Sequence, residues 1–589
     1  MAQQIDIQIE LEGGKAISPF TSITINQSIG GHHSFELKFP SEVVDNADSS
    51  IFNSSKNLIG KSIMVSMDGK TTDEQPKNTF KGIITEVSLE QNDISSPELV
   101  FRGYGPTILL DNVLSCTSFL EKNIGQIVKT ITGTIPQNLA GVKVSPKYSS
   151  TLKYHVQYKE TDYTYLKRLA AEFGEWFFYD GSDIFFGMPS SQKTININFR
   201  KDVSDIHLAL KLQPLKFSYS SYDYLTHQIN QSKSSSVQVS GLDNFGKITS
   251  AESDKLFSNE KNSVANVTLA NKNDLEQHIK FKKAEQAANM VVLSGSCDSP
   301  YLKIGAIINV TLTKRSNEGK ESEEDFGKFT VVSVNHRTNG IGNYQNFFEA
   351  IPSSLQILPV GNIVSPISEP QIGTVIKNND PDAMGRVKVR LAWQTNAEET
   401  PWLRVSTPYA GDKKGFYFIP EVDEQVFVSF ENNDPNLPYV TNAFYHSKQK
   451  HEWNDAKNYK KGIKTKSGNV IQFNDEPGKE TITVFNKDKT NEITLTMEND
   501  GKITIIAKSE ISLKSKKIKI DAEELTINAS KSMKTKAPET TFDASKEFGI
   551  KAAKLNAEGS AEVNIKSSGK VEIAASAMAS VKAGIIKLN

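Results

Sequence analysis

The chain has 589 residues, 68 of them lysine or arginine and 69 aspartate or glutamate. This length predicts several domains, and the near-zero net charge argues against nucleic acid or a stably bound anionic membrane as a partner. No apolar run approaches the ~18 residues of a membrane helix. The two cysteines, Cys116 and Cys297, are too few for a disulfide framework, so we expect free buried thiols in a protein made in the cytoplasm.

The N-terminal part is predicted to be β-rich. It begins MAQQIDIQIELEGG, which alternates apolar and polar residues as a strand does and lacks the basic and then apolar profile of a cleavable signal peptide. Segments such as SITINQS, SFELKF, SIMVSM and ELVFRGYG follow, with turns between them and almost no helical periodicity. Residues 1–110 are therefore predicted to form a β-barrel or sandwich, and any export of the chain is expected to need no cleavable signal.

An α+β segment is predicted over residues 111–195. Helices are expected at Asn123–Thr132 and Asp162–Glu172, the second opened by Thr161 and stopped at Gly174. The stretch EWFFYDGSDIFFG then places two aromatic strands around an Asp-Gly turn, which is the strongest hairpin signal in the chain.

A second β-rich unit is predicted over about 200–350. Strand-like segments such as KIGAIINVTLTK and GKFTVVSVNHR surround one convincing helix, Asp274–Val292. The stretch PVGNIVSPISEPQIG has the composition of a linker, and it leads into a short β domain that is punctuated by glycine and ends near His446. We assign residues 1–355 to an N-terminal hub domain with two β-barrels (about 1–110 and 200–350), 356–446 to the small β domain and 447–589 to the tail.

Several candidate motifs for chemistry are present, and none is complete. Gly241–Lys247 (GLDNFGK) has the spacing of a phosphate-binding loop, but it lacks the following serine or threonine and any βαβ pattern, so a hairpin turn is predicted. His32 and His33 have no acid, cysteine or histidine cluster at ligand spacing and are interpreted as surface or strand residues. His451-Glu452 begins like a zincin helix without the second histidine. No catalytic residue, cofactor or metal site is therefore predicted.

The tail carries a repeat of apolar pairs. The two members of a pair lie two positions apart, so they point to the same side of an extended strand. The first members of successive pairs follow at steps of seven or eight residues, which indicates a repeat of one short strand and one turn. A strand that short cannot cover its own apolar face. The best-patterned pairs are Ile503/Ile505, Ile511/Leu513, Ile518/Ile520, Leu525/Ile527, Val563/Ile565 and Val571/Ile573.

The step length favours a trimer. One coil of a single-chain solenoid needs ~20 or more residues, whereas seven or eight residues make about a third of a turn. Three chains winding together would fill one interior column with these apolar pairs, and their backbone hydrogen bonds would run between chains. Hairpins of a monomer would need regular Asn-Gly or Asp-Gly turns, and Asp500-Gly501 is the single one in the tail. We predict an intertwined trimeric β-helix, a needle on the order of 50 Å long.

Three stretches resemble the valine-glycine repeat (VgrG) spike proteins of type VI secretion systems, which are related to the hub and spike of contractile phage tails. GRVKVRLAWQ and PWLRVSTPYAGDKKGFYFIPEVDEQVFVSFENNDPNLPYVTNAFY are similar to the family's oligonucleotide-binding (OB) fold domain. VQYKETDYTYLKRLAAEFGEWFFYD is similar to the hub signature, and TKSGNVIQFNDEPGKETITV to the entry into the needle. The residues that match the OB pattern are Gly385, Arg386, Val387, Val389, Trp393, Trp402, Arg404, Val405, Ala410, Gly411, Gly415, Pro420, Glu424, Val426, Phe430, Asp434, Pro435 and Pro438.

The chain departs from the family's OB pattern at Asp423, Asn433 and Asn442, where the family usually has glycine. Asn and Asp are the non-glycine residues that best tolerate a positive φ, so the turns are predicted to be kept. The resemblance implies a mainly β fold. It comprises a phage-hub-like pair of β-barrels with a small α+β insert, an OB-fold barrel and the trimeric needle.

The resemblance also implies a function and partners. A homotrimeric spike would cap a hexameric tube protein at its hub, carry effector or adaptor proteins, cross a target membrane mechanically and be secreted by the injection apparatus. An enzyme-bearing spike is disfavoured, because neither Ser447–Gly462 nor the end of the sequence offers room for a catalytic domain of ~100 residues. An extracellular contractile particle or a phage tail would need the same trimer, and these alternatives stay open.

The end of the needle is predicted to be blunt and free of metal. His451, the last histidine, precedes the needle, and no cysteine follows it. Apolar residues continue at core phase to the terminus, so three copies would leave a flat apolar face with open strand edges. In the family a small conical proline-alanine-alanine-arginine (PAAR) repeat protein covers such a face. The contact residues predicted for this tip protein are Val581, Ile585, Ile586, Leu588 and Asn589.

Overall fold

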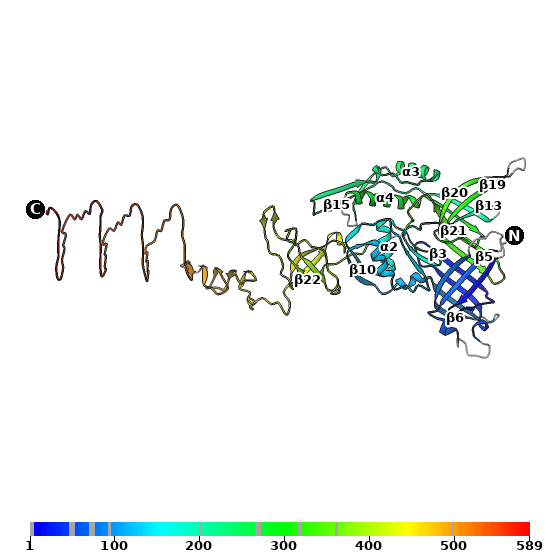
Figure 1. Cartoon of the computed structure of the whole chain (residues 1–589), viewed down its shortest axis with the longest axis horizontal. Coiled ribbons are helices and arrows are strands. Elements are labelled where there is room, and N and C mark those ends of the chain that lie inside the picture. Colours follow the sequence, from blue (N-terminus) through cyan, green and yellow to red (C-terminus); the bar gives the residue numbers. More distant parts are fainter. Residues whose placement is uncertain are drawn as a thin grey trace. The chain divides into compact units, whose positions relative to one another are not determined.

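The structure is a computed structural model that describes residues 5–45, 54–69, 77–91, 96–199, 202–265, 272–315, 321–359, 363–497 and 500–588. The chain divides into two compact units, Met1–Asn454 and Asp455–Asn589. The first unit is built from β-sheets with helices packed among them, and the second contains a strand meander and an extended tail (Figure 1). No helix within the described ranges is both long and apolar enough to cross a membrane.

The N-terminal strands form one part of a large sheet. Alternation gives each strand one buried face: in β4 (Ser34–Pro40), Phe35, Leu37 and Phe39 are buried and the residues between them are partly exposed. These strands pair antiparallel in the order β3-β4-β7-β6-β5-β1-β2. The other bounds are β1 Ile5–Leu11, β2 Lys15–Ala16, β3 Ser22–Ser28, β5 Ser62–Gly69, β6 Asn78–Glu90 and β7 Glu98–Tyr104, with 3-10 turns at Ser41–Val43, Ser55–Leu58 and Pro106–Leu110.

A second group of strands closes into a ring. Because β19 pairs with both β13 and β20, the order β20-β21-β18-β14-β13-β19 returns to its start. β20 also pairs with β3 through residues 333–339, and both groups therefore share one 13-stranded sheet. The bounds are β13 Thr194–Phe199, β14 Val203–Leu210, β18 Val291–Cys297, β19 Ile307–Arg315, β20 Glu321–Asn339 and β21 Tyr344–Pro352.

Helices and two small sheets form the α+β segment. α1 (Ile124–Thr132) begins after Asn123, whose side chain takes part in a reciprocal capping box. α2 (Asp162–Phe173) is capped by Thr161 and ends at Gly174, which has a φ of 68°. Both predicted helices and the predicted Asp-Gly hairpin are confirmed. The strands are β8 Ser115–Asn123, β9 Gly141–Val144, β10 Thr151–Glu160, β11 Phe177–Tyr179 and β12 Asp183–Phe186.

Two helices and a three-stranded sheet accompany the second strand group. α3 (Asn244–Leu256) corrects the hairpin turn predicted at Gly241–Lys247, because the Asp243 side chain accepts a backbone N–H and starts a helix there. α4 (Lys272–Ala288) confirms the helix predicted in this unit, but it ends before Val292 because the chain turns into β18. The sheet has the order β16-β15-β17, with β15 Phe217–Asp223, β16 Gln228–Lys233 and β17 Lys261–Val264, and a 3-10 turn at Ser234–Ser236.

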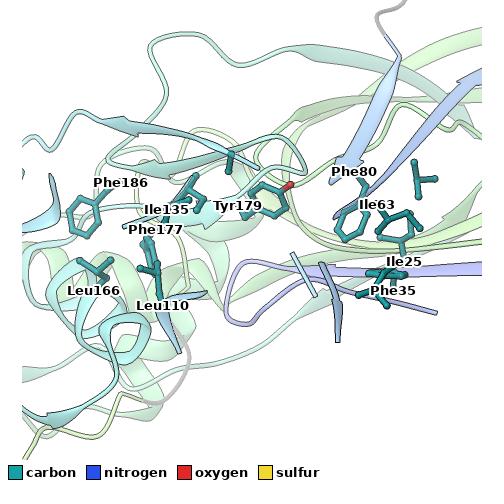
Figure 2. Packing of buried hydrophobic residues seen from close by; sticks show 14 of the residues in the cluster. Ile25, Phe35, Ile63, Phe80, Leu110, Ile135, Leu166, Phe177, Tyr179 and Phe186 are labelled. Carbon is teal, nitrogen blue, oxygen red and sulfur yellow. The ribbon is translucent and has the colours of Figure 1, made fainter. Parts of the chain in front are cut away.

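Two hydrophobic clusters meet at β11. Figure 2 shows the first cluster, in which Phe35 and Phe80 come from the N-terminal strands and Leu166 comes from α2. Phe177 of β11 belongs to this cluster, whereas the next residue, Phe178, belongs to the cluster of the second strand group. Successive strand residues point to opposite faces, so Phe177 and Phe178 of β11 pack into different clusters and connect the two.

A four-stranded antiparallel sheet forms the small β domain. Its order is β23-β22-β26-β27, and Val375, Val389 and Val428 are fully buried in a core of its own. The bounds are β22 Gln371–Lys377, β23 Lys388–Leu391, β24 Ala410–Gly411, β25 Lys414–Gly415, β26 Gln425–Phe430 and β27 Pro438–Ala443, with a 3-10 turn at Glu431–Asn433.

The turn prediction for the small β domain is confirmed at two positions and wrong at the third. Asp423 has a φ of 71° and Asn433 a φ of 59°. Asn442 is not among the residues with positive φ and lies inside β27, opposite Phe427 and beside a shift in strand register. At Asn442 the chain therefore continues as a strand with a shifted register, and it does not form the predicted turn.

The second unit begins with an antiparallel meander in the order β28-β29-β30-β31-β32. Its bounds are β28 Lys460–Lys464, β29 Val470–Asn474, β30 Thr481–Phe485, β31 Asn491–Thr496 and β32 Lys502–Ala507. Residues 508–588, all of which the structure describes, form neither helix nor strand within the single chain.

Candidate functional site

The apolar pairs of the tail are exposed in the single chain. Ile520 is 64% exposed, although complete burial of such a side chain is worth about 1.5–3 kcal/mol. Every residue from 508 to 588 is exposed. The other predicted core residues are also exposed, namely Ile503, Ile505, Ile511, Leu513, Ile518, Leu525, Ile527, Val563, Ile565, Val571 and Ile573. The tail therefore presents a regular row of apolar side chains that its own chain does not cover.

The first pair differs from the others. Ile503 and Ile505 lie in β32, which pairs antiparallel with β31 of the same chain, opposite Leu495 and Ile493. One edge of this strand therefore pairs within its own chain, and pairing between chains at its other edge stays a prediction. The sequence contains the signal for the hairpin, because Asp500-Gly501 lies between the two strands.

Polar residues lie between the two members of each apolar pair; Lys519 and Glu572 are charged, whereas Thr504, Ser512, Thr526 and Asn564 are not. Lys519 lies between Ile518 and Ile520, and its Nζ is 2.6 Å from a carboxylate oxygen of Asp521. In an extended chain the residue between two pair members points away from them. The tail thus has an apolar side and a polar side.

The residues predicted to contact a tip protein are exposed as well. Val581, Ile585 and Ile586 lie on the surface, and Leu588 is 92% exposed. Asn589, the fifth residue of this prediction, lies outside the described residues. Their role in binding a partner stays a prediction.

The paired histidines are structural. His33 is fully buried, so its interpretation as a surface or strand residue is wrong, and burial lowers its pKa to about 3. The His32 ring lies 3.9 Å from the Tyr163 ring, centroid to centroid. Cys297 is buried as predicted, whereas Cys116 is only partly buried. Among the described residues, no group of three or more His, Cys, Asp or Glu side chains could hold a metal ion.

A polar joint fastens the small β domain to the α+β segment. The Asn436 side-chain oxygen accepts the Val156 N–H at 2.8 Å. Glu398 Oε1 accepts both the backbone N–H and the hydroxyl of Ser118, at 2.8 and 3.0 Å. Trp393 packs beside these contacts, against the cluster of three residues from β10 that lines the joint.

A buried ion cluster lies behind this joint. Arg168 of α2 forms ion pairs with Glu160 at 2.8 Å and with Glu172 at 2.7 Å, and Glu172 also lies 2.8 Å from His155 Nε2. Burial raises the pKa of the Glu172 carboxyl, but Arg168 and His155 outweigh it and the pKa falls to about 2. Asp434 and Arg168 line the same cavity, of about 250 Å³.

Sequence analysis missed the joint, although both of its sides lie in quoted motifs. The residues from Val156 to Glu172 belong to the hub-like stretch, and Asp434 and Asn436 belong to the DPNLP stretch of the small β domain. Long-range pairing between two motifs leaves no local pattern. Behind the joint, the carboxylates of Glu160 and Glu172 are held by ion pairs with Arg168, which suits a structural role beside a contact between domains.

The shared sheet, the small four-stranded domain and the uncovered repeat are typical of an assembly protein of the tail-hub class. The chain belongs to the phage tail baseplate hub (GPD) family, whose model matches residues 33–341. The model of the type VI secretion system/phage-baseplate injector OB domain matches residues 371–445, which contain the small β domain.

Individual relatives agree with this assignment. The chain is 23% identical to the type VI secretion system spike protein VgrG1b of Pseudomonas aeruginosa, over 85% of this chain and 69% of that protein. It is 30% identical to the actin cross-linking toxin VgrG1 of Vibrio cholerae, over 26% of this chain but only 16% of the toxin. A solved Francisella PdpA-VgrG complex shares the fold with a TM-score of 0.55 and 9% identity, over 86% of this chain and 80% of that one.

Proposed function

We propose that the chain is a homotrimeric structural spike at the tip of a contractile injection apparatus of the type VI secretion kind. The observation that carries the proposal is the row of apolar pairs, spaced by seven or eight residues and exposed in the single chain. Membership of the hub family and the similarity to spike proteins support it. In this proposal residues 1–355 are the hub, 356–446 the OB domain and 447–589 the needle.

The work of such a spike is mechanical. Three tails bury their apolar sides against one another, and their polar sides face water. Backbone hydrogen bonds between chains then have to break together before the needle yields, which makes the assembly resistant to force and to denaturant. The meander at Lys460–Ala507, which pairs within the chain, forms the root of the needle.

The proposal assigns a partner to each end. The hub contacts a hexameric tube protein, and residues Val581–Asn589 contact a PAAR-like tip protein that covers the exposed apolar end. Effector or adaptor proteins travel with the spike, which is made in the cytoplasm and secreted by the apparatus. The exposure of Val581, Ile585, Ile586 and Leu588 supports the tip contact.

We assign no enzymatic activity to this chain. Its similarity to the Vibrio toxin covers only 16% of that protein, and the relative matched over 85% of this chain is a spike protein. In this proposal the ion pairs of Arg168 with Glu160 and Glu172 stabilise the contact between the small β domain and the α+β segment.

A pair of aspartate substitutions tests the needle. Ile520→Asp would place three carboxylates around one buried axis, where desolvation and mutual repulsion oppose assembly. We expect this variant to aggregate or to lose its trimer. Ser512→Asp is the matched control, because Ser512 lies between Ile511 and Leu513 and faces outward in the same proposal. The readout is the melting temperature and the sedimentation velocity of each variant. An Ile520→Asp protein that melts within a few degrees of the control would overturn the proposed inner side.

A further inference from the structure

A hairpin of the small β domain carries four aromatic residues that are exposed in the single chain. We call residues 408–418 (PYAGDKKGFYF) the arm. β24 and β25 pair within it, Ala410 opposite Gly415, and the Phe416 N–H donates to the Tyr409 carbonyl at 2.9 Å. The Thr407 hydroxyl donates to the Phe416 carbonyl at 2.9 Å at its base. The arm is therefore an ordered hairpin, and Figure 1 shows it standing away from the β22 sheet.

All eleven residues of the arm are exposed. Four of them are aromatic: Tyr409, Phe416, Tyr417 and Phe418, with Tyr417 76% exposed. The core of the same domain is complete without them, since its valines are fully buried. Aromatic side chains that are exposed together on a preformed element are typical of an interaction site, because each buries a large area at low cost in entropy.

The backbone at the turn of the arm fixes its shape. Gly415 has a φ of 139°, and a Cβ at this position would lie 2.5 Å from the Tyr409 carbonyl oxygen. Lys413 has a φ of 56° in the turn. These conformations fix the backbone of the hairpin, and the rings of Phe416 and Phe418 lie 6.5 Å apart, centroid to centroid.

A second patch of exposed apolar residues lies on the same domain. Phe444 and Tyr445 are exposed at the end of β27, where the chain leaves the domain toward the needle root. The arm and this patch are two different surfaces of one domain, so the arm of one copy can bind the patch of the next copy in a head-to-tail contact. Head-to-tail contacts among three copies around one axis close into a ring. The needle requires those copies in the proposed function, and it follows directly after this domain in the chain.

We propose that the arm of each copy lies against the small β domain of a neighbouring copy, at the patch of Phe444 and Tyr445. Each copy then gives one arm and receives one. The contact rests on the proposed trimer and deepens it, because it ties the three small β domains together through residues that are not part of the apolar repeat.

Photo-crosslinking tests the arm. The full-length chain is produced with p-benzoyl-L-phenylalanine in place of Tyr417, irradiated, and separated on a denaturing gel. We expect covalent dimers and trimers, with mass spectrometry placing the crosslinked peptide within residues 420–459 of another copy. The same protein kept in the dark and boiled in detergent before loading is the control for trimers that survive the gel, and it should give monomer only.

The molar mass of the same sample separates two kinds of failure. A monomer in light scattering would overturn the proposed function together with the arm. A trimer in light scattering that yields no covalent dimer, or whose crosslinks fall within the same copy or in the hub, would overturn the arm alone.

A pair of substitutions gives an independent readout. Tyr417→Ser combined with Phe418→Ser removes the apolar surface of the arm, whereas Tyr417→Phe keeps it. In the trimer we expect amide exchange in the peptide that contains Phe444 and Tyr445 to be at least tenfold faster in the double variant than in Tyr417→Phe. Equal exchange rates in the two proteins would contradict the contact.

Discussion

Asp434 has an unusual environment in the joint between the small β domain and the α+β segment. Its Oδ2 atom is buried and has no hydrogen-bond partner among the described residues. Burial and the Glu172 carboxylate raise the pKa of this carboxyl from 3.8 to about 7, although the Asn436 N–H and the Arg168 guanidinium lower it. When the two domains are in contact, the Asp434 carboxyl therefore stays largely protonated up to about pH 7, whereas a solvent-exposed aspartate would already be ionised.

We expect the joint to weaken as the pH rises. A carboxyl whose pKa is raised by docking stabilises the docked state fully below about pH 4, and this contribution is lost as the pH rises through about 7. Asp434→Asn keeps a neutral side chain at every pH, so the joint of this variant should be better protected than wild type at pH 8. The readout is the exchange of the Val156 N–H, which donates to Asn436, corrected for intrinsic rate.

The comparison of the two proteins isolates this single group. Arg168 and Glu172 of α2, and His155 and Glu160 of β10, face the joint identically in both. If the protection of the wild-type Val156 N–H against exchange were the same at pH 5 and pH 8, the raised pKa of Asp434 in the joint would be contradicted.

Two buried histidines make the hub sensitive to acid. Burial lowers the pKa values of His33 and His336 from 6.5 to about 3. His336 Nδ1 lies 2.6 Å from the Tyr344 hydroxyl, and its Nε2 lies 3.2 Å from Gln27 Oε1. The unfolded chain takes up protons first, so stability falls as the pH drops from about 6.5 to about 3, by about 1.4 kcal/mol per pH unit for each histidine.

The variant His336→Gln tests this acid sensitivity. Glutamine does not titrate, so the free energy of unfolding in urea should decrease less between pH 7 and pH 4 than it does in wild type, even if its value at pH 7 is lower. Identical pH dependence in the two proteins would show that His336 does not hold its neutral form in the folded hub.

At the scale of elements, α2 depends on the glycine that ends it. Gly174 has a φ of 68°, and a Cβ there would lie 2.7 Å from the Phe281 ring. We expect Gly174→Ala to lower the free energy of unfolding by about 1–3 kcal/mol, because both the backbone conformation and the packing oppose it. Gly30→Ala is the control, since that glycine has nothing within 4 Å and no positive φ. A urea midpoint that shifts equally in the two variants would contradict the argument.

The sequence predicts those elements whose signals are local. Thr161 and Gly174 define the ends of α2, and the apolar residues between them define its inner face. α3 was missed because its buried residues are Gly246, Thr249 and Ser253, which give no apolar periodicity. The pairing of β31 with β32 was missed because a single Asp-Gly signal was outweighed by the long repeat that follows.

At the scale of the whole molecule, the unpredicted features are contacts between distant segments. The pairing of β20 with β3 and the joint at Asn436 connect residues far apart in the sequence. Neither contact has a pattern within a window of a few residues. The apolar repeat could be predicted because its regular spacing is itself local, and the exposure of its residues in the single chain follows from the same spacing.

The central claim is that three copies of the chain form one spike. Size-exclusion chromatography with multi-angle light scattering on the purified full-length protein measures this directly. The account predicts a molar mass of three times 65.1 kDa that does not change on tenfold dilution. A molar mass of 65.1 kDa for soluble, folded protein would contradict the account.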